Sequence, residues 1–454
     1  MHDLKANART VLFRLALTML VVVPAGALAP SGASAEQAGS KIHRRASGFL
    51  AAGARFSCAR LDTGRVRCWG IGVYGALGYG NTRSIGDNET PGSVGPIDLG
   101  AGRTARAISA GFYHACAILD NGKVRCWGAG FNGALGYGDV ESIGDDETPS
   151  SIGPVNLGAG RTAVAITGGG RHTCAILDNG RVRCWGLGSV GQLGYGNTRS
   201  IGDNETPDTV GPVNLGRGRT AVAITGGGYH TCAILDNGKV RCWGDGYYGQ
   251  LGYGNRKDIG DNEDPGSAGP VKLGRGRKAV AISAGFRDTC AILDNGKVRC
   301  WGLGSSGQLG YGNTKTIGDD ETPASVAPVK LGKGRKAIAI STWGRHTCAV
   351  LDNRTVRCWG TGQYGQLGYG NTRNIGDNEN PGSVGPVKLG RGRKAVAIQG
   401  GGRHTFALLD NGRLRSWGLG SSGQLGYANQ ANIGDNETPA SAGPIDLGGL
   451  VATG

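Results

Sequence analysis

One phrase, close to H-T-C-A-I-L-D-N-G-K-V-R-C-W-G, recurs seven times in this chain at a constant step of 58 residues. A unit of this length is one supersecondary element that cannot bury its apolar face alone, so neighbouring units must pack against one another. The repeats extend from about Arg45 to Leu450 with almost nothing left over, which predicts one closed object rather than several domains. Tryptophan keeps the step throughout, at Trp69, Trp127, Trp185, Trp243, Trp301, Trp359 and Trp417.

The second unit shows how one repeat is expected to fold. Short apolar runs at 105–108, 116–119 and 123–127 predict three strands, and Asp120-Asn121-Gly122 between the last two is a strong hairpin signal. A fourth strand is expected at 154–157, after a long segment rich in Gly, Asn and Asp. Helical periodicity is absent. The prediction is therefore an all-β fold, a seven-bladed β-propeller of four-stranded antiparallel blades.

Residues 1–35 have the composition of a secretory signal. Three cations lie in or before an apolar run at 15–23, and Ala33-Ser34-Ala35 supplies small residues for cleavage. The apolar run is too short to span a bilayer, and no second one follows. We therefore expect a secreted protein, extracellular or periplasmic. Residues 36–44 form a short N-terminal segment, and residues 45–454 form a single propeller of seven repeats.

The cysteines occur in pairs across the predicted hairpins. If Asp120-Asn121-Gly122 is a three-residue loop, Cys116 lies directly opposite Cys126 on a non-hydrogen-bonded pair, with Cα atoms about 4.5 Å apart. That spacing suits a disulfide, as does export. Metal binding is the weaker alternative, because no second Cys or His set accompanies each pair. The predicted bridges are Cys58–Cys68, Cys116–Cys126, Cys174–Cys184, Cys232–Cys242, Cys290–Cys300 and Cys348–Cys358. The seventh unit has Phe406 and Ser416 instead.

The repeat also resembles a known family. The stretch from Gly111 to His114, the hairpin, Trp127-Gly128 and the later Gln192-Leu193-Gly194 match the pattern of the regulator of chromosome condensation repeat. This resemblance implies a seven-bladed propeller that binds a partner protein through loops on one face, here as a secreted, bacterial-type member. The family includes a nuclear guanine-nucleotide exchange factor and a secreted inhibitor of β-lactamases. Exchange activity ranks third, because the constant step leaves no blade with an inserted segment.

Strand direction separates two faces of the expected propeller. The loops between first and second strands, and the segments after the third strands, lie on one face, and their residues differ between units. Aromatic and arginine side chains carry much of the binding energy at interfaces, so we expect a recognition face for a protein. The alternative is that these side chains only pack around the channel mouth. The candidate contact residues are Phe56, Tyr74, Phe112, Tyr113, Phe131, Arg171, Tyr229, Tyr247, Tyr248, Phe286, Arg287, Trp343, Arg345, Tyr364 and Arg403.

Cations concentrate on the opposite face. Of the chain's formal charge of +15, the signal carries +3 and −1, which leaves +13. Such a charge favours an anionic polymer, so a cationic cell-wall or polysaccharide binder is the main alternative function, and solubilising surface is the simplest explanation. Nucleic acid is not expected, because interleaved aromatic side chains are missing there. The connectors carry Arg217, Arg219, Arg275, Arg277, Lys278, Lys333, Arg335, Lys336, Arg391, Arg393 and Lys394, beside Lys123, Lys239 and Lys297.

Two further patterns have a structural explanation. Asp-Asn-Glu, as at Asp87-Asn88-Glu89, could hold calcium, but its presence in every unit favours a capped turn. Histidines at one repeat position, interrupted by Phe56 and Asp288, do not suggest a metal cluster. No serine, histidine and carboxylate set or phosphate loop stands out from the repeats. We expect no enzyme activity, no cofactor, no metal and a monomer.

Overall fold

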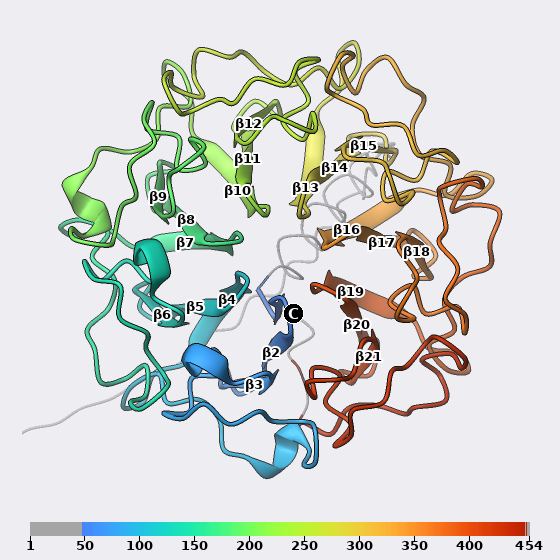
Figure 1. The fold of residues 1–454 in the computed structure, drawn as a ribbon, viewed down its shortest axis with the longest axis horizontal. Coiled ribbons are helices and arrows are strands. Elements are labelled where there is room, and N and C mark those ends of the chain that lie inside the picture. Colours follow the sequence, from blue (N-terminus) through green and yellow to red (C-terminus); the bar gives the residue numbers. More distant parts are fainter. Residues whose placement is uncertain (1–47, 450, 452–454) are drawn as a thin grey trace, which may run out of the picture.

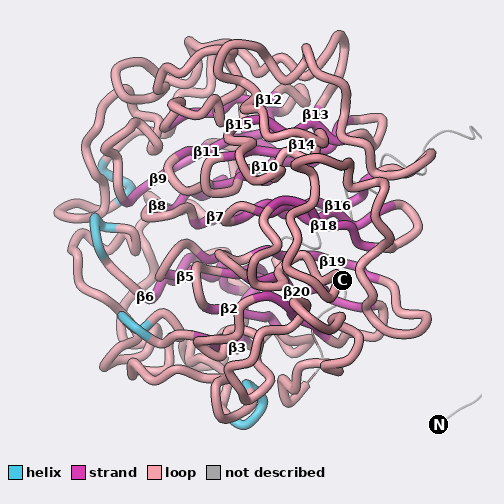
Figure 2. The backbone as a smooth tube through the Cα atoms, turned by 45° about the vertical axis from the view of Figure 1, so that its right-hand side comes forward, coloured by secondary structure: helices cyan, strands magenta, loops and turns pink. Residues whose placement is uncertain are grey.

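The computed structural model of the protein describes residues 48–449 and 451, and the predicted signal (1–35) and N-terminal segment (36–44) lie outside the described residues. Seven separate antiparallel sheets surround a central axis, each built from consecutive strands (Figure 1). Strands run through the middle of the molecule and long loops cover its outside (Figure 2). The prediction of an all-β, seven-bladed propeller is confirmed.

The blades follow one another in chain order. Their strands are β1 Leu50–Ala52, β2 Phe56–Arg60 and β3 Val66–Gly70; β4 Ala105–Ala110, β5 His114–Leu119 and β6 Val124–Gly128; β7 Ala163–Gly168, β8 His172–Leu177 and β9 Val182–Gly186; β10 Ala221–Gly226, β11 His230–Leu235 and β12 Val240–Gly244; β13 Ala279–Ala284, β14 Asp288–Leu293 and β15 Val298–Gly302; β16 Ala337–Trp343, β17 His346–Leu351 and β18 Val356–Gly360; and β19 Ala395–Gly400, β20 His404–Leu409 and β21 Leu414–Gly418. Four 3-10 turns complete the elements, η1 Val73–Gly75, η2 Pro91–Ser93, η3 Phe131–Gly133 and η4 Pro207–Thr209.

Each blade has three strands, so the predicted fourth strand at 154–157 is wrong. Three different groups satisfy the outer edge of β6 instead. The Val155 N–H donates to Val124 O at 2.8 Å, and the Tyr137 hydroxyl accepts from Cys126 N–H at 3.0 Å and donates to Cys126 O at 3.1 Å. Gly128 exchanges two backbone bonds with Ile143. Because the Gly- and Pro-rich segment meets β6 at isolated points, no continuous ladder forms.

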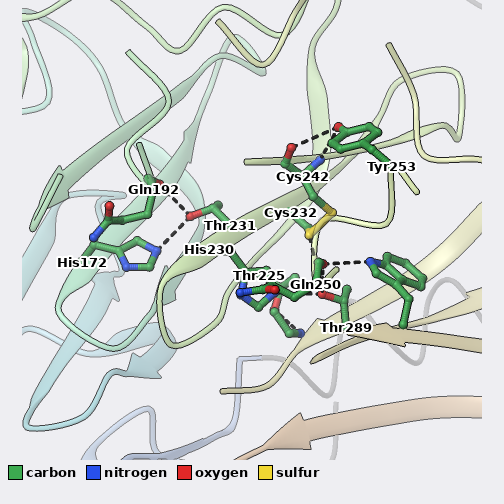
Figure 3. Close-up of a disulfide and its surroundings, with 12 residues drawn as sticks. His172, Gln192, Thr225, His230, Thr231, Cys232, Cys242, Gln250, Tyr253 and Thr289 are labelled. Atoms are coloured by element: carbon green, nitrogen blue, oxygen red, sulfur yellow. Dashed lines mark hydrogen bonds between the residues drawn. A yellow bond between two sulfur atoms is a disulfide. The ribbon is translucent and has the colours of Figure 1, made fainter. Parts of the chain in front are cut away.

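The hairpin register agrees with the cysteine pattern. Cys116 lies opposite Cys126, and the Leu119 N–H donates to Lys123 O across the three-residue loop, in which Gly122 has φ +76°. All six predicted disulfides are present, with Cα–Cα distances of 4.0–4.1 Å. The Cys232–Cys242 bridge, with Tyr253 bonded to Cys242 beside it, is drawn in Figure 3.

Contacts between blades continue around the whole ring. The glycine of each Leu-Gly step packs on the next blade's buried tryptophan, and a Cβ at Gly136 would lie 2.8 Å from Trp185 Nε1. The same contact joins Gly426 of the last blade to Trp69 of the first. Val451 forms a β-bridge with Leu61 of blade 1. In blade 2 the matching bridge joins Ala105 to Leu119, so Val451 takes the place of Ala105. The C-terminal segment therefore completes the innermost strand of the first blade and closes the ring.

Candidate functional site

The two faces are defined by backbone contacts at opposite ends of the strands. On the upper face, the segment after each third strand joins the loop between the first two strands, as where Ala129 N–H donates to Tyr113 O. On the lower face, each connector between blades joins a hairpin turn, as where Asp120 N–H donates to Thr104 O. The upper face therefore carries the predicted aromatic and arginine residues, and the lower face carries the connectors.

A ring of buried histidines supports the upper face from below. His172 Nε2 lies 2.9 Å from Thr231 Oγ1 of the next blade, and this hydroxyl donates to the Gln192 carbonyl at 3.0 Å (Figure 3). Since the threonine proton is already used, the imidazole must donate from Nε2, and its burial favours the neutral form. Burial lowers the pKa of His172 to about 3, with smaller contributions from His114 and His230. The ring links neighbouring blades through these hydrogen bonds.

Five blades contribute a histidine to this ring and two do not. Phe56 replaces one histidine, and the residue that would face it is Ala115, which has no hydroxyl. Asp288 replaces the other, and its Oδ2 is buried without a hydrogen-bond partner. Burial raises the pKa of Asp288 well above its usual value. The ring histidines are His114, His172, His230, His346 and His404.

An aromatic notch opens on the upper face over blades 1–3. We define it as Arg55, Tyr74, Tyr113, Phe131 and Arg171, which line a cavity of about 220 Å³ together with smaller neighbours. The Tyr74 ring meets Phe131 edge-on with centroids 4.9 Å apart and Tyr113 at 5.9 Å. Tyr74 is 43% exposed and Phe131 41%. Within the described part of the chain, neither arginine of the notch makes an ion pair.

This local geometry occurs in the two blades that lack a glutamine of the repeat. In blades 3–7 a Gln side chain accepts from the N–H two residues earlier, as where Tyr248 N–H donates to Gln250 Oε1 at 2.8 Å. Blades 1 and 2 have Ala76 and Ala134 at that position. There, Tyr74 adopts φ 57°, ψ 26° and Asn132 φ 59°, ψ 22°. A left-handed conformation is unusual for a tyrosine, and such strain concentrates at functional sites.

A second aromatic group closes the channel mouth at the centre of the upper face. The Phe112 ring lies 5.6 Å from Trp343 and 5.8 Å from Phe286, and Phe286 lies 5.9 Å from Tyr229. These residues come from blades 2, 4, 5 and 6, so the group reaches across the axis. Below it, the inner strands line a channel of about 840 Å³, which Trp343 also borders. These four side chains pack against one another, and three of them keep part of their surface exposed, so partner contact by them stays a prediction.

The remaining predicted contact residues differ in how far they are exposed. Arg287 stacks over Tyr248, 4.4 Å from the ring centroid, and donates to its hydroxyl at 3.0 Å, while Tyr247 is 61% exposed. Arg403 stacks over Tyr364 in the same way at 4.9 Å, and Arg345 is exposed. Phe56 has no exposed surface and Trp343 has 5%, so both side chains are buried in this structure. For the exposed residues, partner contact stays a prediction.

Ion pairs alter the expected charge of the lower face. The arginine that follows the connector glycine pairs with the aspartate of the next hairpin turn, as Arg277 Nη1 does with Asp294 Oδ1 at 2.9 Å. Equivalent pairs recur in five further blades and are half-exposed. These arginines therefore add little net charge. The excess comes from the cation before the connector glycine and from the lysine after the paired arginine, as at Arg275 and Lys278. Sequence reasoning missed this, although the spacing of 17 residues is constant.

The acidic turns contain the described residues best placed to hold a metal ion. Asp145, Asp146 and Glu147 gather their carboxylates in one group, and Asp319, Asp320 and Glu321 form another. In both, the glutamate accepts a backbone N–H three residues earlier, at 3.2 Å from Gly144 and 3.3 Å from Gly318. Burial, and then Asp320, raise the pKa of Glu321 to about 7. The turns are thus capped by their own glutamates.

A family model described as "RCC1-like domain" matches residues 28–340, and models described as "Regulator of chromosome condensation (RCC1) repeat" match 338–366, 395–424 and 355–408. The chain belongs to this family. The ultraviolet-B receptor UVR8 of Arabidopsis thaliana is 32% identical over 330 residues, 72% of this chain and 68% of that protein. The human E3 ubiquitin-protein ligase HERC2 is 29% identical over 373 residues, which are 81% of this chain but 7% of that protein.

Solved structures agree on the fold. Yeast RCC1 (Prp20), in a structure that also contains Kap60, superposes with a TM-score of 0.64 at 18% identity, over 93% of this chain and 91% of that one. At this identity the likeness shows the fold alone. Among the described residues, no helix has the length and apolar character needed to cross a membrane.

Proposed function

We propose that this member of the family is a secreted, non-enzymatic, monomeric propeller that binds a protein partner through its upper face, with the aromatic notch as the main contact. The observation that carries the proposal is the strained, exposed Tyr74, which packs edge-on against Phe131 of the next blade. The loops after β3 and β6 differ in conformation from their counterparts in blades 3–7, and together they form one notch. The left-handed turns place Tyr74 and Phe131 edge-on in one exposed group.

The chemistry of the notch specifies the kind of partner segment. Its volume of about 220 Å³ lies below the roughly 300–1,000 Å³ of small-molecule sites, but suits an anchor side chain. Arg55 and Arg171 flank the aromatic rings without acidic partners of their own among the described residues. We infer that the partner presents an apolar anchor next to a carboxylate. Exposed aromatic and arginine groups of this kind dominate binding energy at protein interfaces.

Two further observations support the setting of this function. Six disulfides suggest an oxidising, extracellular-type environment, which agrees with the predicted signal. Protein binding also occurs in a structural relative, because Prp20p of Saccharomyces cerevisiae binds Gsp1p and histones. Guanine-nucleotide exchange stays the third hypothesis, because all blades keep the 58-residue step without an insertion.

The test uses the mature chain to capture its partner from the medium of the exporting cell, followed by titration of the two purified proteins. The double variant Tyr74→Ser/Phe131→Ser introduces residues that the chain itself has at these repeat positions, Ser306 and Ser305. We expect at least a hundredfold weaker binding, since two interface anchors are lost. The triple variant Lys272→Asn/Lys330→Asn/Lys388→Asn on the lower face should bind as the parent does. Equal affinity of the notch variant and the parent would refute the proposal.

A further inference from the structure

The lower face has a strong asymmetry between blades. Blades 4–6 carry a basic residue at three repeat positions where blades 1 and 2 carry none. In blade 4 these are Lys272, Arg275 and Lys278, whereas the matching residues of blade 1 are Asp98, Ala101 and Thr104. We call the full set the basic arc. It consists of Lys272, Arg275, Lys278, Lys330, Lys333, Lys336, Lys388, Arg391 and Lys394.

All members of the basic arc are exposed on the lower face. Lys272 follows Val271, whose N–H donates to Val240 at the lower end of β12. The aliphatic stem of Lys278 packs on the hairpin glycine Gly238, because a Cβ there would lie 2.9 Å from Lys278 Cβ. This packing holds the stem on the protein surface and leaves the ammonium group to solvent.

The charge of the arc is not cancelled by the fold. The hairpin aspartates beside these connectors are already paired: Asp294 with Arg277, Asp352 with Arg335, and Asp410 with Arg393. Within the part of the chain that the structure describes, no arc residue makes an ion pair, and Lys394 Nζ only donates to the Asn353 carbonyl at 3.2 Å. The arc therefore presents excess positive charge beside a row of neutralised pairs.

The arrangement indicates an extended ligand. Blades 4–6 are consecutive and pack side by side around the axis, so equivalent cations repeat from one blade to the next (Figure 1). A single small anion would need only one such group. The large exposed aromatic side chains, Tyr74, Phe131 and Tyr247, lie on the opposite face, so bases would find no stacking partners near the arc.

We propose that the basic arc of blades 4–6 binds a linear polyanion without nucleobases, a polymer with a negative group on every repeat, and that it does so independently of the upper face. Charge complementarity carries the recognition. Counterion release from such a polymer drives binding and makes it strongly dependent on salt. Polyanion binding by the arc does not depend on the proposed protein partner.

The experiment compares two variants that lose the same number of charges from the same three blades. Lys272→Asn/Lys330→Asn/Lys388→Asn removes one lysine of the arc from each of the three blades. Asparagine is the natural residue at this repeat position in blades 2 and 3, as Asn156 and Asn214. Lys257→Ala/Lys315→Ala/Arg373→Ala removes exposed cations beside the segments that follow the third strands, using the residue of Ala431. Both variants should fold, because each new residue already occupies its repeat position elsewhere in the chain.

The probe is long-chain inorganic polyphosphate, titrated at several salt concentrations. We expect the arc variant to bind at least about tenfold more weakly, with a slope of log affinity against log salt reduced by about 2, from about 0.7 for each of three lost contacts. The control variant should keep at least half of the parent affinity. Equal losses in both variants would show that only net charge matters and would overturn the proposal.

Two further probes separate the polymer from other anionic surfaces. Vesicles of anionic phospholipid and single-stranded DNA are titrated with the same proteins. Weaker binding of both than of polyphosphate at equal charge supports the polymer. Tighter binding of vesicles would assign the arc to a membrane surface, and tighter binding of DNA would assign it to nucleic acid, and either result overturns the proposal.

Discussion

The upper and lower faces of this propeller are built on the same seven blades, but they differ between blades in different ways. On the upper face, the loss of a glutamine at Ala76 and Ala134 lets two loops adopt left-handed residues and assemble aromatic rings into a notch. On the lower face, the backbone contact between connector and hairpin turn recurs from blade to blade, while the side chains at one repeat position differ, from Asp98 in blade 1 to Lys272 in blade 4. One face changes shape and the other changes charge, so their ligands should respond to different perturbations.

Acidification gives the largest expected effect, because it removes the scaffold that both faces share. Burial lowers the pKa of the ring histidines to about 3 or 4, against about 6.5 when unfolded. The unfolded chain therefore takes up protons first, and stability is lost as the pH falls below about 6.5. At pH 5 each histidine lowers the free energy of unfolding by about 2 kcal/mol relative to neutral pH, and the five together lower it by on the order of 10 kcal/mol.

Denaturant titrations at pH 7.5 and pH 5 measure this loss. Asp288 works in the opposite direction, since burial raises its pKa, and its contribution is lost as the pH rises. We expect both faces to lose their ligands together at the unfolding midpoint. An unfolding free energy that stays constant between pH 7.5 and pH 5 would contradict the neutral ring.

Restoring the missing glutamine separates shape from chemistry on the upper face. Ala76→Gln/Ala134→Gln keeps Tyr74 and Phe131 but supplies the side chain that holds the ordinary loop in blades 3–7. We expect about a hundredfold weaker protein binding, with polyphosphate binding unchanged. Titration calorimetry with both ligands measures the two effects. Full retention of partner affinity would mean that the aromatic side chains, and not the loop geometry, define the site.

The smallest effect is expected for a substitution at Asp288, where the ring of buried histidines is interrupted. Asp288→His should restore the inter-blade bond to Thr347, whose hydroxyl already donates to the Gln308 carbonyl at 3.1 Å. It also removes a buried carboxyl oxygen without a partner. We expect the free energy of unfolding at pH 8 to rise by about 1–3 kcal/mol. Asp288→Asn is the control, because it removes the acid without adding an imidazole. A loss of stability in the histidine variant would show that the aspartate has a role of its own.

Much of the scaffold could be predicted from the sequence, because the constant period identifies the matching residues of the seven repeats. The opposition of Cys116 and Cys126 followed from the three-residue loop, and the two faces followed from strand direction. The three-stranded blade did not, because the Tyr137 hydroxyl takes over strand-edge bonds that the sequence pattern leaves unassigned. Ring closure through Val451 was equally hidden, since one short bridge has no sequence signature.

The candidate site was only partly predictable for a similar reason. Residue type alone could not distinguish the buried Phe56 from the exposed Phe131, because both are aromatic residues in loops or at strand ends of the same face. The repeat position did contain the answer, since Phe56 takes the place of a buried histidine. The pairing of Arg277 with Asp294 was likewise readable only once the connector was placed beside the hairpin turn.

A cross-titration tests the separation of the two faces most directly. The notch variant Tyr74→Ser/Phe131→Ser and the arc variant Lys272→Asn/Lys330→Asn/Lys388→Asn are each titrated with the captured protein and with polyphosphate. We predict that the notch variant loses only the protein and that the arc variant loses only the polymer. Loss of both ligands in either folded variant would contradict two independent faces on one closed ring.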